Sequence, residues 1–256
     1  MFKEKRHLKM AVMIAAVICA ALVTAGCADA ATNEANAAST PKTKASQITL
    51  SWSGDTKTTQ DVNWKGSGST MYVKYAAAKN YDQDGKWTSF TKGKKTTTLE
   101  GHYCRYSARI TKLTADTKYY YIIGAGSKWT AKRTFTTGIE SGDFSFMSLG
   151  DVQFVDRNED YAAWGDDIAA AYKREPGIKF SLMTGDLINV STEIRDWNAF
   201  FNNAMPVFSR IPMMTTSGNH ETPVVPSVYL KMMRTGRRGL KRKYIRLITE
   251  TVILFR

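Results

Sequence analysis

The chain has 256 residues, of which 43% are hydrophobic, so it can bury a sizeable core and is not globally disordered. Its formal net charge of +13 is an excess typical of proteins that bind nucleic acid or anionic membranes. The excess is local, however, because residues 1–221 carry 27 basic against 22 acidic side chains. We therefore expect no nucleic-acid partner for the main body of the chain.

The first segment has the layout of a secretory signal, with basic residues, an apolar run from Met10 to Gly26 and then small residues. Two processing sites fit this layout. The sequence TAGC at 24–27 resembles a bacterial lipobox with threonine at its first position, and Cys27 would then be lipidated. The sequence ADA at 28–30 is an A-x-A site, whose cleavage would release a soluble protein. We expect export to the cell envelope or exterior, and we favour a membrane anchor at Cys27.

The signal segment at 1–27 is followed by small polar residues at 28–46, which predict a flexible tether. Of the three cysteines, Cys19 and Cys27 belong to the signal segment. Cys104 is therefore alone, which excludes an intrachain disulfide framework despite the exported context. We expect Cys104 to be a half-buried strand thiol rather than a reactive one.

Residues 47–138 consist of short β-branched and aromatic runs between polar turns, such as QITLSW, MYVKYA, CRYSARITKL and WTAKRTFTTG. Short strands at this spacing, with no helical pattern between them, indicate an antiparallel β-sandwich. The stretch RITKLTADTKYYYIIG resembles the fibronectin type III pattern around a tyrosine corner. Either Tyr119 or Tyr121 would supply that corner.

Residues 139–233 follow a different pattern, in which DFSFMSLGD, IKFSLMTGD and IPMMTTSGN resemble buried strands that end at a polar residue. Between them, apolar residues on one face predict a helix from Glu159 to Glu175 and another from Thr192 to Met205. The order β-α-β-α-β predicts a parallel sheet with right-handed crossovers. The expected fold class is multidomain, an all-β sandwich followed by an incomplete α/β domain.

Each of these strands delivers a hard oxygen ligand at its carboxyl end, where ligands bind in parallel α/β sheets. The ligands are Asp151 in GDVQ, Asp186 in GDLIN and Asn219 in GNHE. A glycine precedes each of them, and we expect it to let the backbone turn sharply. Gly-Asp alone is a weak signal, whereas GNH[DE] is a rare tetrapeptide. The alternative is that the two aspartates cap loops and that His220 is a surface residue.

With these motifs in this order, the chain resembles the calcineurin-like metallophosphoesterases. It is most similar to the purple acid phosphatase-like branch, in which a fibronectin-like domain precedes the catalytic one. The resemblance implies that Asp151 binds a first metal ion, Asp186 bridges two and Asn219 binds the second. His220 would contact the substrate phosphate and assist the leaving group. The two ions, Fe, Zn or Mn, would hold and deprotonate a water that attacks a phosphate ester.

Three features depart from the family. Asn189 stands where purple phosphatases have a tyrosine ligand three residues after the bridging acid, so it is only a weak candidate for a metal ligand. Gln153 stands where ordinary metallophosphoesterases have a histidine. The later histidine motifs are missing, since no histidine follows His220. We therefore expect a phosphomonoester hydrolase centre with little activity in this chain.

Residues 234–256 have a basic bias without periodicity, as an out-of-frame translation would. Back-translated and read two bases later with free wobble positions, KYIRLITETVILFR can yield IYSFDYGNCHFVS, similar to the segment that follows GNH[DE] in the family. We therefore expect a frameshift between about Met233 and Lys243. Two alternatives remain: a basic arm for membrane or nucleic acid, and an anchored β-sandwich binding or adhesion module with a dead catalytic remnant, whose sheet would have an exposed edge.

Overall fold

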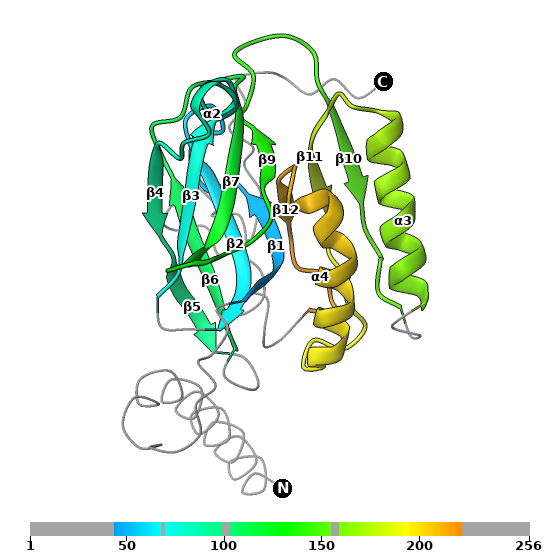
Figure 1. Cartoon of the computed structure of the whole chain (residues 1–256). Coiled ribbons are helices and arrows are strands. Elements are labelled where there is room, and N and C mark those ends of the chain that lie inside the picture. Colours follow the sequence, from blue (N-terminus) through cyan, green and yellow to red (C-terminus); the bar gives the residue numbers. More distant parts are fainter. Residues whose placement is uncertain (1–43, 68–69, 99–102, 155–158, 222–256) are drawn as a thin grey trace, which may run out of the picture.

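The computed structural model describes residues 44–67, 70–98, 103–154 and 159–221. These residues form two units side by side, an all-β sandwich and a smaller α/β unit (Figure 1). The signal segment, nearly all of the predicted tether and residues 222–256 lie outside the described residues. The lipidation of Cys27 and the frameshift therefore stay predictions.

The sandwich consists of two antiparallel sheets, as the sequence predicts. One sheet has the strand order β1-β2-β6-β5, and the other has the order β4-β3-β7-β8 with β9 also paired to β7. The strands are β1 (Ala45–Ser51), β2 (Gln60–Ser67), β3 (Tyr72–Ala77), β4 (Ser89–Lys92), β5 (Lys94–Thr98), β6 (Tyr103–Ile110), β7 (Lys118–Ala125), β8 (Lys128–Trp129) and β9 (Arg133–Thr136).

The core of the sandwich is rich in aromatic side chains. Trp64 of β2 and Tyr106 of β6 are cross-strand partners, and their rings stack with centroids 5.4 Å apart. Such a pair contributes about 0.5–1.5 kcal/mol beyond its burial. Cys104 lies on β6 with 3% of its surface exposed, so its thiol is more deeply buried than the half-buried position predicted.

Tyr119 forms the tyrosine corner. Its phenol oxygen accepts the backbone N–H of Thr114 at 3.0 Å, a few residues upstream. Tyr121 has a different partner, because its hydroxyl donates to the carbonyl of Ser209 in the α/β unit at 2.7 Å. The sequence leaves both tyrosines open as the corner, and the hydrogen bonds assign it to Tyr119.

The expectation that no helix interrupts the strands is wrong. A short helix, α2 (Ala78–Asp84), lies between β3 and β4, and Gly85 ends it in the left-handed conformation with φ 69°. Its sequence, AKNYDQD, has no apolar periodicity, and only Ala78 is buried. A helix of this kind is formed by its capping glycine and its neighbours rather than by a hydrophobic stripe, so its sequence carries little signal.

The α/β unit has a parallel sheet of the order β10-β11-β12, formed by β10 (Ser145–Leu149), β11 (Ile178–Met183) and β12 (Met213–Thr215). The connecting helices are α3 (Glu159–Arg174) and α4 (Ile194–Phe208), and both pack with Met147, Met183 and Met213 in one core. This arrangement confirms the predicted α/β architecture.

Helix α4 is longer than predicted at its carboxyl end. It continues through Pro206 to Phe208, whereas the helix predicted from the sequence stops at Met205. Pro206 is exposed in the last turn, where its missing N–H removes a single main-chain hydrogen bond. Among the residues that the structure describes, no helix is long and apolar enough to cross a membrane.

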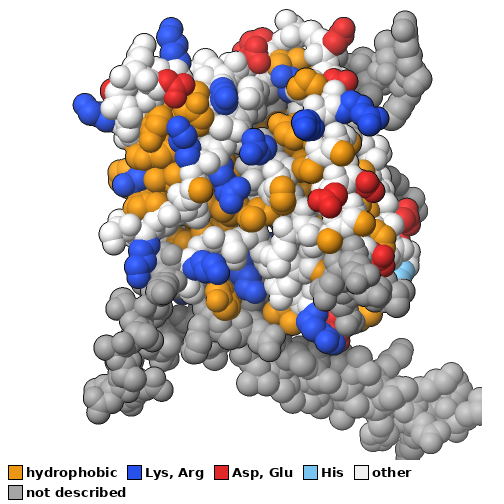
Figure 2. All heavy atoms as spheres, turned by 45° about the vertical axis from the view of Figure 1, so that its right-hand side comes forward, with side chains coloured by type: hydrophobic (Ala, Val, Ile, Leu, Met, Phe, Trp, Pro, Cys, Tyr) orange, Lys and Arg blue, Asp and Glu red, His pale blue; other side chains and the backbone are white. Residues whose placement is uncertain are grey.

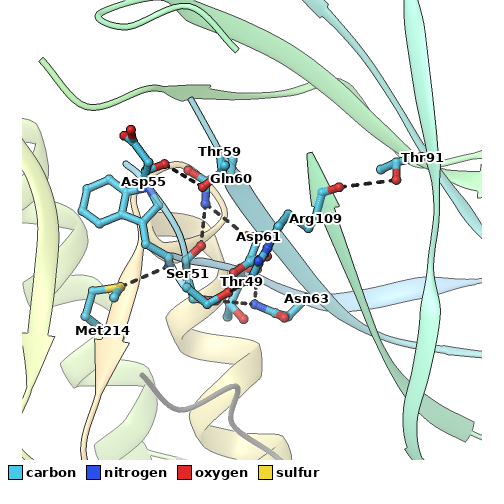
Figure 3. Close-up of polar contacts among 12 residues, drawn as sticks. Thr49, Ser51, Asp55, Thr59, Gln60, Asp61, Asn63, Thr91, Arg109 and Met214 are labelled. Carbon is cyan, nitrogen blue, oxygen red and sulfur yellow. Dashed lines mark hydrogen bonds and ion pairs between the residues drawn. The ribbon is translucent and has the colours of Figure 1, made fainter. Parts of the chain in front are cut away.

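The two units share an extensive interface. Leu50 of β1 forms a parallel bridge with Pro212, directly before β12. The backbone N–H of Trp52 lies 3.3 Å from the sulfur of Met214, which reaches from β12 toward the sandwich (Figure 3). Strand β1 therefore lies against the outer edge of β12, which would be exposed only under the alternative of a catalytic remnant that cannot fold.

Candidate metal centre

The three candidate ligands lie at one edge of the α/β sheet. Asp151 follows β10, Asp186 follows β11 and Asn219 follows β12. Because the three strands are parallel and adjacent, the loops that follow them meet at the same carboxyl edge. Asp151 and Asn219 are exposed and Asp186 is half-buried, so this edge is accessible to a ligand from solvent.

Both aspartates have an unusual backbone conformation. Asp151 has φ 53° and Asp186 has φ 51°, which is the left-handed region. Aspartate enters this region more readily than most residues, at a cost of about 1–2 kcal/mol. The sequence predicts the sharp turn at the preceding glycines, but of those only Gly185 has a positive φ, at 104°. The strain lies on the two candidate ligands themselves, as is common at functional sites.

The glycines have another function, which is to let the three loops touch. A side chain at Gly185 would collide with the backbone of Gly218, and one at Gly218 would collide with the carboxylate and backbone of Asp186. The backbone N–H of Asp151 also donates to the carbonyl of Gly185 at 3.3 Å. The absence of a Cβ at these positions therefore brings the loops after β10, β11 and β12 into contact.

Glu221 holds this arrangement together, although the sequence pattern assigns it no role. Its side chain is fully buried. Its carboxylate accepts the backbone N–H groups of Asp186 at 2.9 Å, Leu187 at 2.7 Å, Ile188 at 3.4 Å and Gly218 at 2.7 Å. A buried acid needs such donors, because an unpaired carboxylate is costly to desolvate. Glu221 thus ties the loop after β11 to the loop after β12.

His220 is fixed by two hydrogen bonds. Its backbone N–H donates to Oδ1 of Asp186 at 2.9 Å. Its ring Nδ1 lies 2.8 Å from the carbonyl oxygen of Asn189. A carbonyl oxygen only accepts, so Nδ1 carries a proton. In the neutral ring, Nε2 is then the unprotonated nitrogen, and in the charged ring Nε2 can donate a proton.

Asn189 and Gln153, the two departures from the family pattern, have different surroundings. Asn189 contacts His220 through its backbone carbonyl, so its observed contribution comes from the main chain rather than from the side-chain amide. The side-chain oxygen of Gln153 is buried and has no hydrogen-bond partner among the described residues. Neither observation makes Asn189 a metal ligand, which stays a prediction.

The donors at this edge fit a hard cation, but they do not close a site. Asp151, Asp186 and Asn219 offer carboxylate and amide oxygens, which suit Mg²⁺, Ca²⁺ and Mn²⁺. Within the described ranges, no group of three or more His, Cys, Asp or Glu side chains could hold a metal ion. Water and further ligands would have to complete the coordination shell.

The sandwich matches one family model. Residues 45–137 match the family model "Purple acid Phosphatase, N-terminal domain". The sandwich is therefore similar to the N-terminal domain of purple acid phosphatases. The match covers the sandwich and does not extend to the α/β unit, where the candidate ligands lie. Comparison of the sequence with curated proteins gives no significant match.

Solved structures resemble the two units together. Purple acid phosphatase PPD1 from yellow lupin (Lupinus luteus) seeds aligns with a TM-score of 0.56 and 18% identity, over 70% of this chain and 36% of that one. PhoD aligns with a TM-score of 0.47 and 15% identity, over 73% of this chain and 40% of that one. The lupin structure shows a shared fold for the described residues. The chain spans about a third of that protein's length, according to the same 36% coverage.

Proposed function

We propose that the α/β unit carries part of the centre of a metal-dependent phosphomonoester hydrolase. The observation that carries this proposal is the contact between Asp186 and His220, in which the backbone N–H of His220 donates to Oδ1 of Asp186. The carboxylate proposed to bridge two metal ions, that of Asp186, thereby lies beside His220, the proposed general acid, at the carboxyl edge of a parallel sheet. The match of residues 45–137 to the purple acid phosphatase N-terminal domain supports the same function.

Each residue has a proposed role. Asp151 would hold a first cation, Asp186 would lie between two cations and Asn219 would hold the second. When bound, two such ions supply a nucleophilic water and stabilise negative charge on the phosphate oxygens. The ions proposed are Fe, Zn or Mn, and of these three Mn is the one that the oxygen donors present suit best.

His220 would work from its Nε2 atom, because Nδ1 is engaged by the carbonyl of Asn189. This hydrogen bond fixes the plane of the ring and the position of its proton. In the charged ring, Nε2 can donate to a phosphate oxygen or to the leaving group, which is the work of a general acid. Glu221 would act on this chemistry indirectly, since it fixes the backbone on both sides of the candidate ligands.

The proposed turnover of this particular chain is low. His220 is the only histidine after residue 102, so the α/β unit offers oxygen donors and a single imidazole. Oxygen donors in small number hold divalent ions weakly unless water completes the shell. We therefore propose phosphomonoester hydrolysis as the activity of proteins with a complete centre of this kind, and a much lower rate of the same reaction for this chain.

The test compares two Gly-Asp pairs in the full chain. Hydrolysis of p-nitrophenyl phosphate is measured with added Mn²⁺ or Zn²⁺ for the wild type, for Asp186→Asn and for Asp143→Asn. Asp143 also follows a glycine but is exposed in the segment before β10, so it is a matched control. We expect metal-dependent turnover to fall to background in Asp186→Asn and to stay unchanged in Asp143→Asn. Equal turnover in all three proteins would remove the proposed centre.

A further inference from the structure

The outer face of one sandwich sheet carries an unusual set of side chains. In β3 and β7, Val73, Tyr121 and Ile123 point into the sandwich core, so Tyr72, Lys74 and Tyr120 lie on the opposite, outer side. Six aromatic residues gather on this side or beside it: Tyr72, Tyr81, Trp87, Phe90, Tyr120 and Trp129. Three lysines, Lys74, Lys118 and Lys132, lie over their rings. We refer to these nine residues as the aromatic–lysine face.

The lysines of this face are organised by the rings. The ammonium of Lys74 lies 4.2 Å from the centroid of Trp129. The ammonium of Lys132 lies 4.2 Å from the centroid of Tyr120 and 4.7 Å from that of Tyr81. Each contact contributes about 0.5–1 kcal/mol at an exposed position. Lys118 and Lys132 are exposed and Lys74 is half-buried, so solvent and an anionic partner can reach this face.

The face also exposes apolar surface that a soluble domain usually covers. Phe90 is 71% exposed, and its ring meets the edge of Tyr72 at 6.0 Å. On the sandwich side of the view in Figure 2, hydrophobic and basic side chains lie interspersed, and the acidic side chains lie mainly along the upper rim and over the α/β unit. An exposed apolar patch among cations is typical of an interaction surface.

The chemistry of this face fits a membrane surface better than a sugar. Sugar hydroxyls need hydrogen-bond acceptors as well as donors, and the three lysines of the face only donate, so within the nine residues only tyrosine hydroxyls can accept. Asp82 is one acid beside it, and the hydroxyl of Tyr120 already donates to its carboxylate at 3.4 Å. In contrast, aromatic rings settle at the level of lipid headgroups, and lysines attract anionic lipids by about 1 kcal/mol each.

We infer that the aromatic–lysine face docks on the surface of a membrane that contains anionic phospholipid. Phe90 and the neighbouring rings would enter the headgroup layer, and the three ammonium groups would meet lipid phosphates. Strands β3 and β4 lie at the far side of the sandwich from α3 (Figure 1), and all nine residues of the face belong to the sandwich rather than to the α/β unit. The inference depends neither on the proposed phosphoesterase chemistry nor on lipidation of Cys27.

The test uses the full chain and vesicles of phosphatidylcholine with or without phosphatidylglycerol, brominated near the headgroup end of the acyl chains. Bromine quenches tryptophan fluorescence at short range, so Trp87 and Trp129 report docking. Three proteins are compared, the wild type and two variants that each lose three basic side chains. They are the wild type, a Lys74→Gln/Lys118→Gln/Lys132→Gln variant, and a control Lys173→Gln/Arg174→Gln/Arg195→Gln variant, whose residues are exposed on α3 and α4.

We expect phosphatidylglycerol to cause quenching in the wild type and in the control variant. The face variant should lose this quenching, because removal of three lysines lowers the ratio of membrane-docked to undocked protein by about a hundredfold. Phe90→Ser, which changes no charge, should also weaken the quenching. The inference is wrong if quenching is the same without phosphatidylglycerol, if the control variant loses as much as the face variant, or if neither the lysines nor Phe90 matters. All variants carry the same N-terminal segment, so its own affinity for lipid cancels.

Discussion

The carboxylate of Glu221 accepts the backbone N–H of Asp186 at 2.9 Å, across 35 positions of the sequence. The same carboxylate accepts the N–H of Gly218 at 2.7 Å, so one buried side chain fixes the backbone of two loops. These loops carry two of the three candidate metal ligands. The arrangement makes the geometry of the candidate centre depend on a residue that is not itself one of the candidate ligands.

Replacement of Glu221 by glutamine should destabilise the α/β unit. The glutamine amide brings donors toward backbone N–H groups and removes the charge that these groups stabilise. We expect a loss of about 2–4 kcal/mol in the free energy of unfolding, measured by chemical denaturation. Glu140→Gln is the control, because Glu140 is 68% exposed in its ion pair with Lys57 and its loss should cost less than about 1 kcal/mol. Equal effects of the two substitutions would show that Glu221 does not hold the loops.

Gly218→Ala should disturb Asp186 directly. The added methyl group would collide with the carboxylate and the backbone of Asp186, and overpacking of this kind costs about 1–3 kcal/mol. Gly126→Ala is the comparison, because Gly126 has φ 56° but nothing near its missing side chain, so its cost is only backbone strain of about 1 kcal/mol. Gly218→Ala should displace the backbone amide resonance of Asp186 in NMR spectra, and Gly126→Ala should not. An unmoved Asp186 resonance in Gly218→Ala would contradict the packing of the loops.

His220 should be found as the tautomer with its proton on Nδ1. The carbonyl of Asn189 accepts from that nitrogen at 2.8 Å, whereas a free imidazole in water favours the other tautomer. Long-range ¹H–¹⁵N correlation spectra at alkaline pH distinguish the two. Replacement of His220 by glutamine identifies its signal among the three histidines of the chain. A proton on Nε2 would mean that the bond to Asn189 is not formed in solution.

The stability of the protein should fall in strongly alkaline solution. Burial raises the pKa of the Tyr121 and Tyr161 phenols above the ordinary value of 10.0, and the arginines near Tyr121 offset only part of this. The unfolded chain therefore loses these protons at lower pH than the folded protein does, so stability is intact below pH 10.0 and declines as the pH rises above it. In Tyr121→Phe and in Tyr161→Phe, the free energy of unfolding, measured from denaturation curves, should fall less steeply with pH above about pH 10. An unchanged slope in both variants would show that the buried phenols do not cause the decline.

The architecture follows from local patterns, which explains why most of it could be predicted. The alternation in MYVKYA, which forms most of β3, and the apolar stripe of α3 are properties of consecutive residues, and both elements occur as expected. Helix α2 could not be predicted, because its sequence has no stripe. The continuation of α4 past Met205 could not be predicted either, since proline in a last turn is tolerated only when its neighbours allow it.

The candidate site was only partly predictable for a related reason. Strand ends and glycines place Asp151, Asp186 and Asn219 at one edge, because the carboxyl ends of parallel strands always meet. The role of Glu221 depends on donors 33 to 35 positions away, which no local pattern contains. The one signal available in the sequence was that an acidic residue, Glu221, directly follows the rare GNH tripeptide. Its burial, seen only in the structure, then calls for hydrogen-bond donors, since acids are seldom fully buried without partners.

The most direct test of the central claim is to follow Mn²⁺ binding to the full chain by NMR line broadening. Paramagnetic Mn²⁺ broadens resonances near its site, so Gly150, Gly185, Gly218 and His220 should broaden first in the wild type. In Asp186→Asn, whose side chain cannot act as a bridging carboxylate, the same resonances should stay sharp at equal Mn²⁺. Broadening that spreads evenly over the exposed acids, or that persists unchanged in Asp186→Asn, would show that the carboxyl edge of this sheet is not a metal centre.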